Sequence, residues 1–484
     1  MSSTSPTSSS ASRRRLVLAI CCTSLFIVTL DNTILQIALP SLQRDLHAPL
    51  SGLQWTIDAY TLVLASLLML AGSLADRFGR RRVFMVGLTV FTVGSVLCSL
   101  APTLQWLIVF RMVQAVGGSM LNPVAMSIIT HTFTDRRERA RAIGAWGAVV
   151  GLSMAAGPLV GGLLVDTAGW RSIFWINLPV GLAALIATRL FVPESRAETA
   201  RRPDPIGQLL VIALLAMLTY TIIHAPDIGW ASPATLVRAA VSLILLAALT
   251  WYELRREEPL IELSCFRSAP FTGAALNALA SFSTLGGFLF LTTLYLQNVR
   301  HLSALHAGLW LLPMAVTVFA SAPLSGRLVA RVGPRPPLFV AGCAITASGA
   351  LFAAFDGQTH TWSMILGCAL FGTGFGFVNA PITHTAVSGM PVSQAGVASS
   401  LASTFRQTGS VLGIAVLGAV LASHLDPHAY ATTYTAAARP AWWIIAGCGL
   451  TVVVIGRLTN TRHAHDSDGE PDREPDREPD RLAN

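Results

Sequence analysis

The stretch Gly72-Ser-Leu-Ala-Asp76-Arg77-Phe-Gly79-Arg80-Arg81-Arg82 lies between two long apolar runs. A weaker copy, Gly326-Arg-Leu-Val-Ala-Arg331-Val-Gly333-Pro-Arg335, follows later in the chain. The first glycine, the leucine, one arginine, the second glycine and a last arginine coincide in the two copies. Each copy comes after the second apolar run of a block of six. Because many secondary transporters are built from repeated helical halves, the repeat predicts two related six-span halves.

The composition places these runs in a membrane. The chain has 484 residues, of which 53% are hydrophobic and only 12% are charged, whereas soluble domains carry about 25% charged residues. This excludes a disordered chain and argues against a soluble enzyme. We find fourteen apolar runs that are long enough for a helix of about 20 residues to cross a bilayer. Since the alternation of a β-barrel is absent, the predicted fold is an all-α polytopic membrane protein.

The arginines predict the orientation. The net charge is +8, and most of the arginines fall in the loops on the same side as the N-terminus. Arginines accumulate in cytoplasmic loops, so we expect both termini in the cytoplasm and the chain in the cytoplasmic membrane. The same bias explains the net charge without nucleic acid. Arg13, Arg14 and Arg15 precede the first run, which lacks a cleavage site and is therefore interpreted as a retained span.

The expected domain organisation has five parts. Two six-span halves flank a linker with two extra spans, and polar segments precede and follow them. The tail repeats Glu-Pro-Asp-Arg three times, which indicates disorder. The expected boundaries are a disordered lead at 1–15, an N-terminal half at 16–192, the linker at 193–270, a C-terminal half at 271–457 and a disordered tail at 458–484.

Charged side chains within spans are costly and therefore functional candidates. Asp31, Asp58, Arg111 and Arg406 are embedded in predicted spans. A carboxylate at membrane depth can exchange a proton near neutral pH, and a nearby arginine would control that exchange. Asp31 with Arg111 is the predicted coupling pair, with a static ion pair that fixes helix packing as the alternative. Asp58 lies near an outer loop, so it is either a further coupling residue or simply faces water.

Two glycine-containing motifs suggest moving parts. In the first loop, Gly79 permits a tight turn, and Asp76 can accept hydrogen bonds from a helix N-terminus or an arginine. The alternative is that the arginines only keep this loop on the cytoplasmic side of the membrane. The fifth span carries small residues at helical spacing that allow close helix contact, and Pro158 bends it. Its motif residues are Gly151, Gly157, Pro158, Gly161 and Gly162.

Several stretches in register resemble the major facilitator superfamily, in particular the fourteen-span drug–proton antiporters of the QacA/EmrB type. The loop at 72–82 is similar to the superfamily loop between spans two and three. The stretches at 30–40 (LDNTILQIALP), 111–117 (RMVQAVG), 151–162 (GLSMAAGPLVGG) and 170–181 (WRSIFWINLPVG) resemble further family motifs. Leu35-Gln36 replaces the usual Val-Asn, Ala115 replaces a glycine, and Ala330 replaces the acid of the second loop.

The resemblance implies export of amphipathic drugs, antibiotics or other secondary metabolites in exchange for protons. It implies that Asp31 and Arg111 couple protons, that the residues 72–82 loop governs the conformational switch, and that the fifth-span motif limits leak. Gln114, Asn177 and Arg406 lie in family-like stretches and are further candidates, as are Gly326, Arg331, Gly333 and Arg335 of the second loop.

Other functions are weaker fits. An uptake carrier would share the fold, but the fifth-span motif argues against it. A membrane enzyme would need clustered acids, histidines or metal ligands, which we do not find. A non-transporting sensor would need a surface for a partner, and because the loops are short, only the tail repeat could provide it. No nucleotide-binding or metal-binding motif appears, so we expect no cofactor, a proton gradient as the energy source, and a monomer.

Overall fold

The computed structural model describes residues 7–196, 204–256, 259–355, 360–388, 390 and 395–459. These ranges are helical throughout, with short connections and no strand. Fourteen helical segments are long and apolar enough to cross a membrane. The predicted all-α fold and the number of spans are therefore confirmed.

The N-terminal half contains six crossings, the last of which is broken at Ile176. The helices are α1 (Thr7–Leu46), α2 (Leu50–Phe78), α3 (Arg80–Ser99), α4 (Leu104–Thr132), α5 (Arg136–Ala168), α6 (Ser172–Trp175) and α7 (Asn177–Phe191). Because α1 begins at Thr7, the expectation of a disordered lead over residues 1–15 is wrong for residues 7–15. The apolar run that follows allows the helix to extend back into the Ser-rich stretch.

The extra pair and the C-terminal half follow. The extra helices are α8 (Pro205–Ile228) and α9 (Pro233–Glu253). After the 3-10 turn η1 (Leu263–Arg267) come α10 (Ala269–Leu294), the π-helix η2 (Tyr295–Val299), α11 (Ala304–Trp310), α12 (Leu312–Val332), α13 (Arg335–Ala353), α14 (Thr361–Ser388), α15 (Ala395–His424), the 3-10 turn η4 (Pro427–Ala429) and α16 (Tyr430–Thr459). The repeats of the tail lie outside the described residues.

Glycines bring helices of the N-terminal half into backbone contact. A Cβ on Gly117 of α4 would lie 2.2 Å from Phe91 N of α3. A Cβ on Gly94 of α3 would lie 2.6 Å from the Cα of Gln114 on α4. Small residues at such positions let membrane helices pack by direct backbone approach. The contact fixes Gln114 in the interior of this half.

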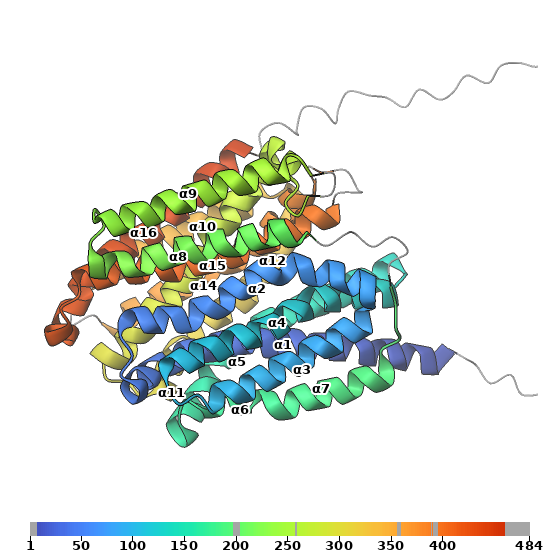
Figure 1. Cartoon of the computed structure of the whole chain (residues 1–484), viewed down its shortest axis with the longest axis horizontal. Coiled ribbons are helices and arrows are strands. Elements are labelled where there is room, and N and C mark those ends of the chain that lie inside the picture. The colour runs from blue at the N-terminus through green and yellow to red at the C-terminus, as the bar shows by residue number, and fades with distance from the viewer. Residues whose placement is uncertain are drawn as a thin grey trace, which may run out of the picture.

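The two halves lie side by side, and the extra pair lies across their junction (Figure 1). The halves meet where α2 packs on α15 and where α5 packs on α11 and α12. Helix α8 packs on both α2 and α15. Helix α9 lies outside α8 and exposes Leu243 and Ile244, which are 67% and 65% accessible. In a multi-pass membrane protein such an apolar face meets lipid.

The bundle has two distinct ends. The arginine-rich end carries the α2–α3 loop, the α4–α5 loop and the start of α1. The distal end carries the α1–α2 turn, the end of α5 and the start of α11. Gly79 and Gly333 end α2 and α12 with φ of 107° and 83°. Because only glycine adopts such angles without strain, both copies of the loop need their second glycine.

Candidate functional site

Asp31 of α1 and Arg111 of α4 form an ion pair inside the N-terminal half. Their residue exposures are only 3% and 0%, and Arg111 Nη1 donates to Asp31 Oδ2. The guanidinium carbon lies 4.0 Å from the centre of the Tyr60 ring. Such a cation–π contact further stabilises a desolvated arginine. The predicted pairing of the two embedded charges is thus present in the structure.

Two amides complete the surroundings of the carboxylate. Gln114 Nε2 donates to Asp31 Oδ1 at 2.8 Å, and Asn177 Nδ2 donates to the same oxygen at 3.0 Å. Gln114 Oε1 also accepts from Arg111 Nη1 at 2.9 Å. Asn177 in turn donates to Ser95 Oγ at 3.0 Å. Both amides, singled out only from family-like stretches, therefore belong to one network of zero net charge that links α1, α3, α4 and α7.

This network is satisfied on one side only. Arg111 Nε and Nη2 have no hydrogen-bond partner among the described residues. Leaving buried donors of a charged group without partners is costly. These two nitrogens are therefore available to bind another acceptor. Asp31 therefore occupies only one of the three nitrogen atoms of the Arg111 guanidinium.

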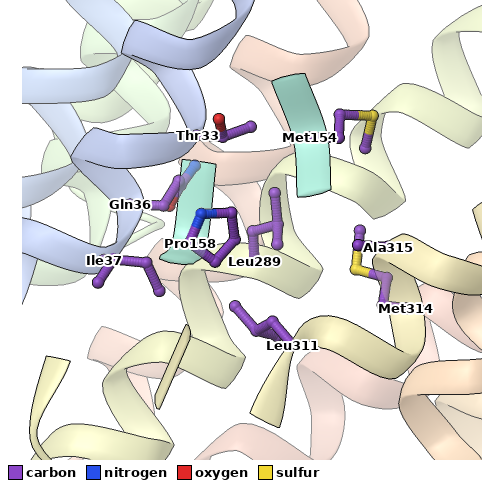
Figure 2. A pocket seen from close by; sticks show the side chains of 9 residues that line it. All are labelled: Thr33, Gln36, Ile37, Met154, Pro158, Leu289, Leu311, Met314 and Ala315. Carbon is purple, nitrogen blue, oxygen red and sulfur yellow. The ribbon is translucent and has the colours of Figure 1, made fainter. Parts of the chain in front are cut away.

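A small pocket lies between the two halves (Figure 2). Its lining is mostly apolar, and Thr33 and Gln36 of α1 supply the polar atoms. Gln36 Oε1 is buried without a partner among the described residues. The lining residues come from α1, α5, α10 and the α11–α12 junction, and they are Thr33, Gln36, Ile37, Met154, Pro158, Leu289, Leu311, Met314 and Ala315. Amphipathic ligands contact walls of this kind, but in this conformation the pocket has room for little more than a water molecule.

The fifth-span motif places its glycines on two different neighbours. A Cβ on Gly157 would lie 2.0 Å from Thr33 Oγ1, and one on Gly161 would lie 3.2 Å from the Cα of Ile34. Both contacts are with α1 of the same half. Gly162 instead faces the other half, where a Cβ would lie 2.6 Å from the Cα of Leu305. The motif therefore holds α5 against the pocket wall and against α11.

The halves are joined by hydrogen bonds at the distal end. Asp166 accepts from the backbone N–H groups of Ala304 and Leu305 at 3.1 and 3.0 Å. Gln297 Nε2 donates to Ile37 O at 2.8 Å. Three further bonds join Asn298 to Gln43, and Gln54 to Ile414 and Ala415. The sequence patterns did not reveal these residues, because the residues at one end of a helix give no indication of their partner in the other half.

Within the described ranges, several glycines toward the arginine-rich end make no contact with the other half. A Cβ added to Gly72, Gly144, Gly147 or Gly326 would meet no atom within 4 Å in the described part of the chain. Gly151, near the middle of α5, would meet only Phe319, at 3.5 Å. The two halves thus approach closely at the distal end and stand apart around α5 at the arginine-rich end.

The first loop is held within its own half. Asp76 Oδ1 accepts from Arg80 Nη2 at 3.1 Å. Glu194, beyond α7, accepts from the backbone N–H of Arg81 at 3.0 Å. Its other oxygen lies 3.7 Å from Arg82 Nε. Glu194 was not predicted as part of the site, although an acid after the sixth span is the natural counter-charge for three arginines.

The remaining loop candidates make fewer contacts. The guanidinium carbon of Arg77 lies 5.7 Å from the ring centre of the adjacent Phe78. In the second loop, Arg331 and Arg335 are exposed. The second loop therefore keeps the turn of the first copy, with its glycine, but has an alanine where the first copy has Asp76.

Arg406 of α15 lies apart from the Asp31 network. Its guanidinium donates to Thr383 Oγ1 of α14 at 3.2 Å and to Ser403 Oγ at 2.9 Å. Both partners are neutral hydroxyls. Arg406 is only partly buried, so it is a cationic group on the C-terminal half and is not a member of the coupling pair.

Asp58 of α2 is fully buried. Its exposure is 0%, and neither carboxylate oxygen has a hydrogen-bond partner among the described residues. The expectation that this side chain simply faces water is therefore wrong. Its position near a loop in sequence is misleading because α15 contacts α2 at Gln54 and α8 contacts it at Trp55, each within about one turn of Asp58.

A profile of the Major Facilitator Superfamily matches residues 21–414. The chain belongs to the major facilitator superfamily. It is 39% identical over 408 residues to the multidrug resistance protein Stp of Mycobacterium tuberculosis, covering 84% of this chain and 76% of Stp. It is 40% identical over 400 residues to the tetracenomycin C resistance and export protein of Streptomyces glaucescens, covering 82% and 74%.

Solved structures of this superfamily share the fold at low identity. A bacterial homologue of the human lysosomal transporter Spinster, inward-facing and unoccupied, matches with a TM-score of 0.64, 16% identity and coverage of 92% and 97%. A D-xylose–proton symporter matches with a TM-score of 0.65, 14% identity and the same coverage. These likenesses concern the fold alone.

Proposed function

We propose that this chain exports an amphipathic drug, antibiotic or other secondary metabolite across the cytoplasmic membrane in exchange for protons, and thereby confers resistance or self-resistance. The observation that carries the proposal is the 40% identity over 400 residues to a resistance and export protein. We place the arginine-rich end and both termini in the cytoplasm, by the bias of arginine.

In this orientation the structure corresponds to an inward-facing state. The halves are bonded at the distal, outer end, while the glycines of α5 at the cytoplasmic end stand free. Rocking of one half against the other around the central pocket would alternate access. The substrate would enter between α5 and α12 from the cytoplasmic side and bind beside Gln36 and Thr33.

Asp31 is the proposed proton carrier. In the present arrangement its charge is balanced by Arg111 and it accepts hydrogen bonds from Gln114 and Asn177. A proton on Asp31 would remove the charge that holds Arg111 and free the guanidinium to turn toward another acceptor. Asp31 and the pocket residue Thr33 both lie on α1, so we propose that a movement of α1 carries that change to the substrate site. No cofactor is needed, and a monomer contains every part of this cycle.

A susceptibility panel tests the proposal. Wild type, Asp31→Asn and Asp227→Asn are expressed at matched membrane levels in a host that lacks its own pumps. Asp227 is the control because its side chain is 61% exposed at the end of α8. We expect wild type and Asp227→Asn to protect against some antibiotics or cationic dyes, and Asp31→Asn to lose that protection.

Three results would count against the proposal. Equal protection by Asp31→Asn would show that the ion pair only fixes the packing of the helices. Accumulation of a compound, with increased sensitivity in the wild type, would instead favour an uptake carrier. Absence of protection across a panel rich in secondary metabolites would favour a membrane sensor.

A further inference from the structure

Asp58 lies on the face of α2 that meets the other half. Gln54 and Leu62 are four residues away on either side, so the three side chains share one face of the helix. Gln54 Nε2 donates to Ile414 O and Ala415 O of α15, both at 3.0 Å. Leu62 packs in one buried cluster with Val411 of α15. Asp58 therefore lies one turn below the hydrogen bonds that seal α2 to α15.

The extra helix α8 covers the same stretch of α2. Gln208 Nε2 donates to Ser66 O, and Trp55 Nε1 donates to His224 Nε2 at 3.4 Å. Between these two points Leu215 of α8 belongs to the buried cluster that contains Leu62. Asp58 is thus enclosed by α8 as well as α15. The extra pair does more than connect the halves, because it closes off the surroundings of a carboxylate.

An ionised carboxylate is unfavourable at this position. Both oxygens of Asp58 are buried without a partner in the described part of the chain. Burying an unpaired charge is strongly unfavourable even after the surroundings relax, whereas burying the neutral acid costs much less. The closed arrangement of α2, α8 and α15 therefore requires a proton on Asp58.

Charged groups on the neighbouring elements are engaged elsewhere. Arg111 of α4 is bound to Asp31 and lies over the ring of Tyr60. His224 of α8 contacts Trp55 and Asp227 toward the distal end. Arg406 of α15 points to Thr383 and Ser403. The other charged or titratable groups of the helices that pack on α2 lie toward their ends, and they are Arg13, Arg14, Arg15, Arg44 and Asp45 of α1, Arg80, Arg81 and Arg82 of α3, His131 of α4, and His424 of α15.

We infer that Asp58 is a second proton-binding site that acts as a lock on the distal end. When the halves separate there, the bonds of Gln54 to α15 break and Asp58 meets the water outside. A proton from outside neutralises it, and only then can α2 close again on α15 and α8. This inference rests on the proposed proton-driven cycle, and it gives the extra helices a part in that cycle.

Spin-label distances across the distal end test the lock without any drug. Thr167 and His306 are exposed and adjoin the bonded pair Asp166 and Leu305. Thr167→Cys and His306→Cys are introduced into a background with the seven native cysteines replaced. The labelled protein is purified into lipid nanodiscs. Distances are measured by pulsed electron resonance from pH 5 to pH 9.

The ratio of closed to open distal ends is expected to fall by up to tenfold for each unit by which the pH rises, as linkage to one proton requires. Asp58→Asn should remove this slope and stay closed at every pH, since the amide is always neutral. Asp58→Glu should keep the slope. His224→Gln should keep it too, which separates Asp58 from the nearest histidine.

Retention of the wild-type slope by Asp58→Asn would overturn the inference, as would an open distal end in that variant at every pH. Loss of the slope in His224→Gln alone would show that the histidine binds the proton, and this would also overturn the inference. Failure of the drug panel leaves this measurement unaffected, so the two proposals fail separately.

Discussion

Gly162 of α5 lies against Leu305 of α11 so closely that a Cβ would come within 2.6 Å of the Leu305 Cα. The contact joins the two halves at the distal end, directly beside the bonds that Asp166 accepts from Ala304 and Leu305. A glycine of the fifth-span motif therefore determines how tightly this end can close. By contrast, a Cβ on Gly147 of the same helix would meet no atom within 4 Å in the described part of the chain.

Gly162→Val should destabilise the closed distal end. The added side chain cannot be placed without moving the α11 backbone, at a cost of about 1–3 kcal/mol. We expect the distance between labels at positions 167 and 306 to shift toward the open population. Leu163→Val is the matched control, since Leu163 is 52% exposed on the outside of the helix. An unchanged distance distribution in Gly162→Val would show that this contact does not limit closure.

Gly147→Leu should block the opposite movement. If the halves close at the arginine-rich end during the cycle, the empty space beside Gly147 must be filled by the other half. A leucine there should trap the present conformation and abolish efflux, while the folded state keeps its stability because nothing is displaced. Gly147→Ala should retain most of the efflux. Thermal unfolding in detergent checks the stability, and normal efflux in Gly147→Leu would contradict the proposed closure.

Gly79→Ala should disturb the loop of the arginine-rich end. Gly79 has φ of 107°, and a Cβ would lie 2.6 Å from Glu194 Oε1. The backbone strain alone costs of order 1–3 kcal/mol. We expect slower transport at normal membrane levels, together with release of Glu194 from the Arg81 N–H. Glu194→Gln should give a milder defect of the same kind, and wild-type rates in both variants would exclude a role for this contact.

Removing both charges separates the structural role of the Asp31–Arg111 pair from its functional role. Asp31→Asn leaves a buried arginine uncompensated and should lower stability by about 3–5 kcal/mol. The double variant Asp31→Asn/Arg111→Gln has no charge at either position and should recover most of that loss, as followed by thermal unfolding. A double variant as unstable as Asp31→Asn alone would show that the uncompensated charge is not the cause.

Much of the site follows from the sequence. Embedded charges are rare in spans, so the pairing of Asp31 with Arg111 could be predicted from their positions in the first and fourth apolar runs. The loop at 72–82 and its copy predicted the two halves, because a charged turn at the same place in two blocks needs a common origin. The number of spans followed from the lengths of the apolar runs.

Other features depend on tertiary contacts that no local pattern reveals. Asp58 seemed close to water because only its distance from a loop was visible, whereas α8 and α15 bury it. Asp166 and Gln54 join the halves through backbone groups of the partner helix, and any sequence offers those. Glu194 lies far along the chain from the arginines that it contacts. The start of α1 at Thr7 shows a helix extending into residues whose composition alone suggests a flexible lead.

The central claim is that proton movement through the Asp31–Arg111 network drives export. The most direct test uses proteoliposomes loaded with a compound identified by the susceptibility panel. Uphill transport under an imposed pH gradient is compared with exchange of the compound at equal concentrations and equal pH. We predict that Asp31→Asn/Arg111→Gln still exchanges the compound but no longer moves it uphill. Uphill transport by that double variant at the wild-type rate would contradict the claim.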